Sequence, residues 1–98
     1  MKNVYEIKDI LKKELPFLKK EYAVVYLGIF GSYIRNEQNS ESDLDLLVDF
    51  ESTRYPGLKY FQLIEHLQEI LNIKIDLVPK NALRKRIGNK ILSEVEEL

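Results

Sequence analysis

Hydrophobic residues recur along this chain with two different periods, and the changes of period divide it into helices and strands. The first apolar positions lie three or four residues apart, which predicts an amphipathic helix. Val4, Ile7, Ile10, Leu11 and Leu15 mark it. Pro16 should end or kink this helix. Residues 23–30 are then almost continuously apolar and rich in β-formers, as in a buried central strand that Gly31 stops.

The middle of the chain adds a second strand and a second long helix. Residues 32–36 can form a short helix, residues 36–42 a polar loop, and residues 44–50 a strand. After a loop at 51–57, helical spacing returns and predicts a long helix that Asn72 can cap. The apolar positions of this helix are Leu58, Phe61, Ile64, Leu67 and Leu71.

The last third of the chain completes the pattern. Alternating residues at 73–78 predict a third strand that Pro79 ends, and Asn81 can cap a final helix. One face of that helix would carry Leu83, Ile87, Ile91, Val95 and Leu98. The expected order, αβ(α)βαβα, belongs to the α/β (α+β) class, with helices packed on a sheet. With 98 residues, we expect one domain over residues 1–98.

Charge and composition exclude several classes of protein. The formal net charge is −1, so direct binding to nucleic acid is not expected. The absence of cysteine excludes disulfides and thiolate zinc sites. No apolar run approaches the roughly 20 residues of a membrane span, and residues 1–18 do not form a signal peptide. We therefore expect a cytoplasmic protein that does not bind membranes.

Gly31 and Ser32 lie where the first strand should turn into the short helix. Glycine lets the backbone approach a ligand closely, and free N–H groups at a helix start favour a phosphate. Ser32 can add a hydroxyl. The two residues also fit a simple turn and helix cap, and those roles are compatible with phosphate binding.

Three aspartates supply the candidate chemistry. Asp43 and Asp45 are two apart at the start of a predicted strand, so their side chains point to one face. Such carboxylates repel each other unless a cation lies between them, and Mg²⁺ binds carboxylates together with substrate phosphates. Asp76 reaches the same side if its strand neighbours the second one. It would then bind a second metal, act as general base, or both. Taken alone, Asp43 and Asp45 would more simply be strand-end acids that face water.

Together these residues resemble the polymerase-β-type nucleotidyltransferase superfamily, in particular its smallest branch, the MNT domains paired with HEPN toxins. The matching positions are Gly31-Ser32, Arg35, Ser42-Asp43, Asp45-Leu46, Val48 and Asp76. The likeness runs from the first predicted helix to residues 91–94. Asn36 is a departure, because the family usually has glycine there, although Asn tolerates left-handed backbone.

The resemblance implies a nucleotidyltransferase fold, with a mixed sheet of three strands or slightly more flanked by helices. It implies transfer of AMP from ATP, with two Mg²⁺ ions, to a tyrosine of a HEPN ribonuclease toxin, so that the protein acts as an antitoxin. The catalytic and metal-binding residues would be Asp43, Asp45 and Asp76, and the nucleotide-binding residues Gly31, Ser32, Arg35 and Ser42. Arg35 could instead pair with Asp43 or Glu37.

Two other functions stay open at this point. An inactive MNT domain could neutralise the toxin by binding alone, an alternative suggested by Asn36. A small-molecule nucleotidyltransferase of the aminoglycoside type is also possible, but it usually needs an added substrate domain. Because 98 residues leave little material for an acceptor pocket, we expect a partner protein to supply the acceptor. The basic residues from Lys80 to Lys90 fit a solvated face or, less simply, a patch that faces RNA or the toxin.

Overall fold

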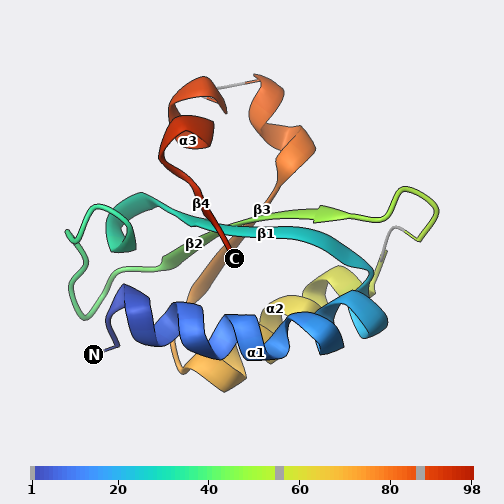
Figure 1. Cartoon of the computed structure of the whole chain (residues 1–98), viewed down its shortest axis with the longest axis horizontal. Coiled ribbons are helices and arrows are strands. Elements are labelled where there is room, and N and C mark those ends of the chain that lie inside the picture. The colour runs from blue at the N-terminus through green and yellow to red at the C-terminus, as the bar shows by residue number, and fades with distance from the viewer. Residues whose placement is uncertain (1, 55–56, 86–87) are drawn as a thin grey trace.

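A four-stranded mixed sheet forms the centre of the molecule, in the strand order β3-β2-β1-β4. The computed structural model describes residues 2–54, 57–85 and 88–98, without the side chains of residues 83–85. Helices α1 (Val4–Tyr22) and α2 (Lys59–Leu71) cover one face of the sheet. The short 3-10 helix η2 (Lys80–Lys85) and helix α3 (Gly88–Glu94) lie on the other face (Figure 1). This mixed α/β architecture confirms the expected fold class.

Helix α1 does not end at Pro16, although an end there was one of the two outcomes expected from the sequence. Its start is fixed by a capping box, in which Asn3 and Glu6 each accept the other's backbone N–H. The helix then continues through Pro16 to Tyr22. Pro16 removes one helical hydrogen bond, but it lies on the exposed side, where water can satisfy the freed carbonyl. The buried stripe continues past it and includes Ile7, Leu11, Leu18 and Tyr22.

The two central strands form the longest pairing of the sheet. Strand β1 (Val24–Phe30) runs antiparallel to β2 (Leu44–Phe50), with Phe30 opposite Asp45. Alternate side chains of β2 point to opposite faces. The inward set packs against α1 and α2 and consists of Leu44, Leu46, Val48 and Phe50. On the other face Leu47 packs with Phe30, so the sheet carries a large cluster below and a small one above.

Strand β3 (Ile75–Pro79) runs parallel to β2, as a strand that follows a crossover helix must. Helix α2 supplies the crossover and ends at Asn72, which has a φ of 54° and caps it in left-handed backbone as predicted. The strand begins two residues later than the alternation suggested. Ile75 and Leu77 join the large cluster, so Asp76 points to the opposite face.

The prediction of one long final helix is wrong. The chain instead forms η2, then α3, then the two-residue strand β4 (Glu96–Glu97), which pairs antiparallel with Gly28 and Ile29 of β1. Ile91 and Val95 pack on the upper cluster, whereas Leu98 packs against the large one. A single helical stripe cannot reach both clusters, so the segment leaves the helix after Glu94. Ile87 and the side chain of Leu83 lie outside the described residues.

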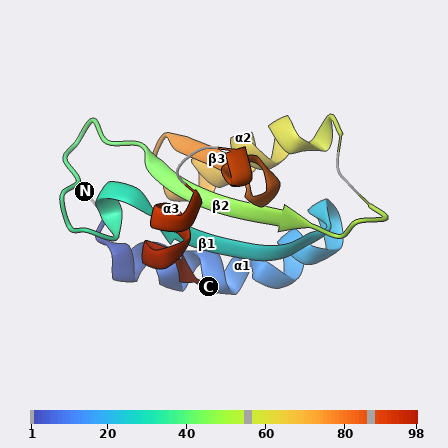
Figure 2. The same cartoon turned by 90° about the horizontal axis from the view of Figure 1, so that it is seen from above.

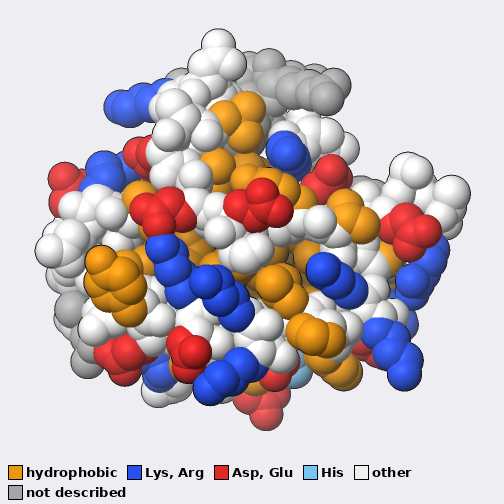
Figure 3. Space-filling model, viewed as in Figure 1, with side chains coloured by type: hydrophobic (Ala, Val, Ile, Leu, Met, Phe, Trp, Pro, Cys, Tyr) orange, Lys and Arg blue, Asp and Glu red, His pale blue; other side chains and the backbone are white. Residues whose placement is uncertain are grey.

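The surface carries charges of both signs. In the face seen in Figure 3, Lys and Arg side chains are interspersed with Asp and Glu over α1 and the adjoining edge of the sheet. Over the described residues, no helix is both long and apolar enough to cross a bilayer. Viewed from above, α3 lies over the end of β1 and the start of β2 and leaves the start of β1 and the end of β2 uncovered (Figure 2).

We predict that Gly28→Ala will destabilise the protein by displacing the C-terminal segment. A Cβ at Gly28 would lie 2.7 Å from Val95 Cγ2 and 3.3 Å from the Glu96 carbonyl oxygen. Overpacking of this kind typically costs about 1–3 kcal/mol. The measurement is the free energy of unfolding in urea for G28A, V95A and the double variant. G28A should cost less in the V95A background, and equal costs in both backgrounds would show that the segment does not lie over Gly28.

Candidate active site

The residues singled out from the sequence come together where β1, β2 and β3 lie side by side. Gly31 directly follows β1, and Asp45 lies in β2 opposite Phe30. Asp45 is also the register partner of Asp76 in β3. Neighbouring strands are about 4.8 Å apart, so these two aspartates are adjacent on one face. Gly31, Asp45 and Asp76 are therefore brought together by the register of β2 with its two neighbours, β1 and β3.

The carboxyl groups of Asp45 and Asp76 are close enough to share a hydrogen bond when Asp45 is protonated. Burial is the main cause that raises the pKa of Asp45 to about 6, and the negative charges of Asp76 and Asp43 add to it. Arg35 acts in the opposite direction but more weakly. The three aspartates therefore interact electrostatically, and the central one is held in an environment that disfavours its charge.

These carboxylates could hold a divalent cation. Within the described residues, no three Asp, Glu, His or Cys side chains form a ready-made ligand cluster. Mg²⁺ does not require one, since it typically binds one or two carboxylates and completes its shell with water and substrate phosphates. Asp45 with Asp76 provides such a pair, and Asp43 lies just before β2 on the same side. A cation there would also remove the electrostatic cost of ionising Asp45.

Gly31 is required at its position by the Asp45 side chain. Its φ is +81°, which side chains rarely adopt, and a Cβ there would overlap Asp45 Oδ2. The absence of a side chain at Gly31 therefore lets the Asp45 carboxylate lie directly against the turn. The sequence indicated a close approach of backbone to ligand, whereas the structure shows a close approach of backbone to a candidate ligand-binding side chain.

The turn after Gly31 is shorter than the predicted helix at 32–36. Only one 3-10 turn forms, η1 (Gly31–Tyr33), so the expected helix dipole is largely missing. Ser32 is half-buried, and among the described residues no group is bonded to its hydroxyl. The turn closes at Asn36, which has a φ of 58°. Asn36 thus adopts the left-handed backbone that glycine adopts readily.

Glu94 belongs to this site, and the sequence pattern did not reveal it as a functional candidate. Its Oε1 accepts the Gly31 N–H at 2.8 Å and a bond from Arg35 Nη1 at 2.9 Å. Arg35 also donates from Nε to Glu37 at 2.8 Å. The pairing of Arg35 with Glu37 was one expected alternative, and no contact with Asp43 occurs among those described. Glu94 is 63 residues from Gly31 in the chain, so no local period could point to it.

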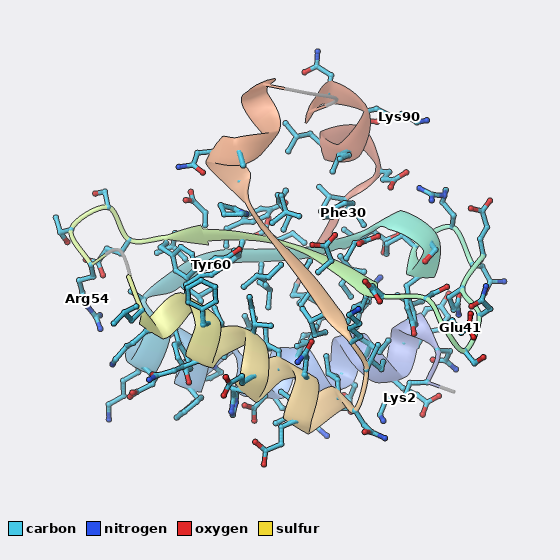
Figure 4. All side chains as sticks on the ribbon, turned by 180° about the vertical axis from the view of Figure 1, so that it is seen from behind. Lys2, Phe30, Glu41, Arg54, Tyr60 and Lys90 are labelled. Carbon is cyan, nitrogen blue, oxygen red and sulfur yellow. The ribbon has the colours of Figure 1, made fainter. Side chains whose placement is uncertain are left out.

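Ser42 stabilises the loop before β2. Its hydroxyl oxygen accepts the Asn39 N–H at 2.9 Å, and its own N–H donates to the Asn39 carbonyl at 3.1 Å. Ser42 and Asp43 line a cavity of about 730 Å³ at this end of the sheet. Lys2 and Glu41, which lie near each other in Figure 4, belong to the same lining. Asp45 and Asp76 do not, so the cavity adjoins the acid pair without containing it.

The geometry agrees with comparisons to known proteins. A family model described as a nucleotidyltransferase domain matches residues 4–98. The chain belongs to this nucleotidyltransferase family. A protein of Methanocaldococcus jannaschii, named as a candidate protein adenylyltransferase, is 47% identical over 94 residues, which cover 96% of this chain and 95% of that protein. The protein adenylyltransferase MntA of Thermococcus cleftensis is 40% identical over 96 residues, with 97% and 95% coverage.

Solved structures give the same fold. One described as a candidate minimal nucleotidyltransferase superposes with a TM-score of 0.83 at 28% identity, covering 99% of this chain and 97% of that one. A chain from a toxin–antitoxin structure with AMP-PNP gives a TM-score of 0.65 at 21% identity, covering 88% and 70%. The second likeness shows the fold alone. Together with the family match, the first confirms a nucleotidyltransferase of the minimal, MNT type.

We predict that metal-free Asp45→Asn will be more stable than the wild type at pH 8 but not at pH 4. The pKa of Asp45 is raised from 3.8 to about 6 in the fold, so ionisation favours the unfolded chain. The stability of the wild type should therefore fall as pH rises from about 4 to above 6. The full shift corresponds to about 3 kcal/mol, and because Asp45 is partly solvated, we expect about 1 kcal/mol.

The measurement is urea unfolding in EDTA across this pH range. Asp49→Asn is a matched control, because it removes the same charge from an exposed position four residues along β2. The interpretation would be wrong if D45N and D49N changed stability with pH in the same way.

Proposed function

We propose that this domain transfers AMP from ATP to a tyrosine of a HEPN-type ribonuclease toxin and thereby acts as its antitoxin. The observation that carries the proposal is the adjacency of Asp45 and Asp76, with Asp43 beside them, at the Gly31–Ser32 turn. Membership of the nucleotidyltransferase family supports the reaction type. The relative from Thermococcus cleftensis, named as a protein adenylyltransferase, supports a protein as acceptor.

Asp43, Asp45 and Asp76 would hold one or two Mg²⁺ ions. When bound, Mg²⁺ would neutralise charge on the triphosphate and on the attacking and leaving oxygens. Two of the aspartates would also contribute through their positions. Asp45 lies directly against Gly31, so it would hold a cation close to the turn where the phosphates would bind. Asp76 is exposed on β3 and is placed to accept the proton of the acceptor hydroxyl.

The proposed reaction is an in-line displacement at the α-phosphorus of ATP. The tyrosine oxygen forms a bond to that phosphorus, the bond between the α-phosphorus and the bridging oxygen breaks, and pyrophosphate leaves. The tyrosine proton passes to Asp76. Ser32 and the guanidinium of Arg35 would bind the phosphates, while Gly31 contributes the shape of the turn rather than its N–H. Ser42 would act through the loop that carries Asp43.

The exposure of the acid pair supports an acceptor that comes from another protein. Asp76 is exposed and Asp45 is partly exposed, although α3 lies over the same end of the strands, where its Glu94 accepts the Gly31 N–H (Figure 2). The chain also spans 95% of the length of these curated relatives, which are named as protein adenylyltransferases. A side chain on a partner could therefore reach Asp76 without any rearrangement of the sheet.

Inhibition by binding alone is the second candidate function. The feature that suggested it, Asn36 in place of glycine, does not alter the turn, because Asn36 adopts left-handed backbone. A different observation favours inhibition by binding alone. The Gly31 N–H and one N–H of Arg35 Nη1 already donate to Glu94, so a nucleotide would meet a carboxylate at these donors. The two functions differ in one measurable property, the mass of the toxin after incubation.

We predict that Asp43→Asn and Asp45→Asn will each reduce AMP transfer by at least about 100-fold without unfolding the domain, as expected when charge stabilisation at a reacting phosphate is lost. The assay incubates each variant with the purified HEPN toxin, ATP labelled at the α-phosphate and Mg²⁺. Asp49→Asn should transfer AMP at the wild-type rate.

Intact-mass measurement of the toxin separates the two functions. An added AMP with the wild type, absent with D43N and D45N, would support the enzyme. A toxin that stays inhibited by the variants and never gains mass would establish inhibition by binding. Normal labelling by D45N would refute the assigned site.

A further inference from the structure

We propose that Glu94 is a positioning residue that holds the Gly31 turn and the Arg35 guanidinium in the arrangement that binds the nucleotide triphosphate. This inference rests on the proposed function, because it assigns the phosphates to Ser32 and Arg35. It concerns a residue from the C-terminal segment, outside the strands that carry the three aspartates.

The first argument is the anchoring of the Glu94 carboxylate. Oε1 accepts the Gly31 N–H at 2.8 Å, so the carboxylate is fixed to a backbone group and not only to another mobile side chain. The same bond is the main cause that lowers the pKa of Glu94, and Arg35 adds to it. A carboxylate that stays ionised at this point provides a permanent negative charge beside the turn.

The second argument is what the carboxylate does to Arg35. Nη1 of Arg35 donates to Oε1 at 2.9 Å and to Oε2 at 3.1 Å, while Nε donates to Glu37. Glu94 and Glu37 therefore bind two different parts of one planar guanidinium and restrict its rotation. Arg35 is about half exposed, with 46% of its side-chain surface accessible, and such a side chain would otherwise sample many rotamers. Its remaining N–H donors stay available for phosphate oxygens.

The third argument is that the backbone carrying Glu94 is itself held on both sides. Before it, Ile91 packs on Phe30 and Leu47. After it, β4 pairs with β1, the Leu98 N–H donates to the Leu27 carbonyl at 2.9 Å, and Glu96 pairs with Lys8. The position of Glu94 is therefore set by the sheet, and through it the sheet determines where Arg35 lies.

Glu94 could instead compete with the nucleotide phosphates for the same donors, and its removal would then change nucleotide affinity in the opposite direction. If the carboxylate occupied the place of a phosphate, its removal would free the Gly31 N–H and strengthen nucleotide binding. Positioning predicts weaker binding, because Arg35 loses its fixed orientation and the turn loses its tether. The sign of the change in affinity therefore decides between the two roles.

The test compares Glu94→Gln with Glu97→Gln. Both remove one negative charge from the C-terminal segment, but Glu97 lies in β4 and makes no described hydrogen bond to Gly31 or Arg35. The Kd for AMP-PNP in the presence of Mg²⁺ is measured by calorimetry. E94Q should raise it about tenfold, the usual loss for a charge-assisted hydrogen bond, while E97Q should leave it unchanged. In an Arg35→Ala background, E94Q should raise the Kd less than it does in the wild type, because only the tether to the Gly31 turn is then lost.

A second readout reports on the turn directly. Amide hydrogen exchange at Gly31 should accelerate in E94Q, while the amides of β2 keep their protection. Tighter AMP-PNP binding by E94Q, equal effects of E94Q and E97Q, or additive effects with R35A would each overturn the proposal. The proposed function fails separately: in that case the wild type itself would not bind AMP-PNP or transfer AMP.

Discussion

The contact between the Asp45 carboxylate and the α-carbon of Gly31 is the constraint on which the rest of the site depends. A side chain at residue 31 would overlap Asp45 Oδ2, so the acid could not occupy its place beside the turn. Because β2 is paired on both sides, the position of Asp45 also fixes Asp76 in β3 and the end of β1 at Phe30. One residue without a side chain thus permits a turn and two neighbouring carboxylates to occupy the same small region.

This arrangement has a cost in stability that the fold offsets elsewhere. Burial of Asp45, together with the negative charges of Asp76 and Asp43, raises its pKa to about 6, so at neutral pH its ionisation opposes folding. The large cluster beneath the sheet compensates, since Ile7, Leu46 and Leu67 are fully buried within it. Functional sites commonly concentrate unfavourable electrostatics in this way, and the cation expected to bind would relieve it.

Local patterns in the sequence predicted the strands and the acids, but not the contacts between distant segments. The strand at residues 44–50 was predicted with its observed bounds, because polar loops flank it on both sides, and the cap at Asn72 was confirmed. Other expectations differ from the structure where tertiary packing decides the outcome. Helix α1 passes through Pro16 because the apolar stripe on its buried side continues, and the C-terminal segment breaks because it serves two clusters. Glu94 was missed as a site residue because its partners are defined only by tertiary structure.

The C-terminal segment links the two faces of the sheet in a way that bears on partner recognition. Val95 closes the small upper cluster and Leu98 the large lower one, with Glu94 immediately before them. A partner that docked against α3 would therefore press on the same short segment that holds Arg35. Because β4 pairs with β1, the backbone hydrogen bonds of the sheet, and not the exposed arginine, would keep this segment in place when a partner binds. The segment that completes both clusters also lies against the candidate site, so a substitution in it is expected to change both the stability of the fold and the geometry of that site.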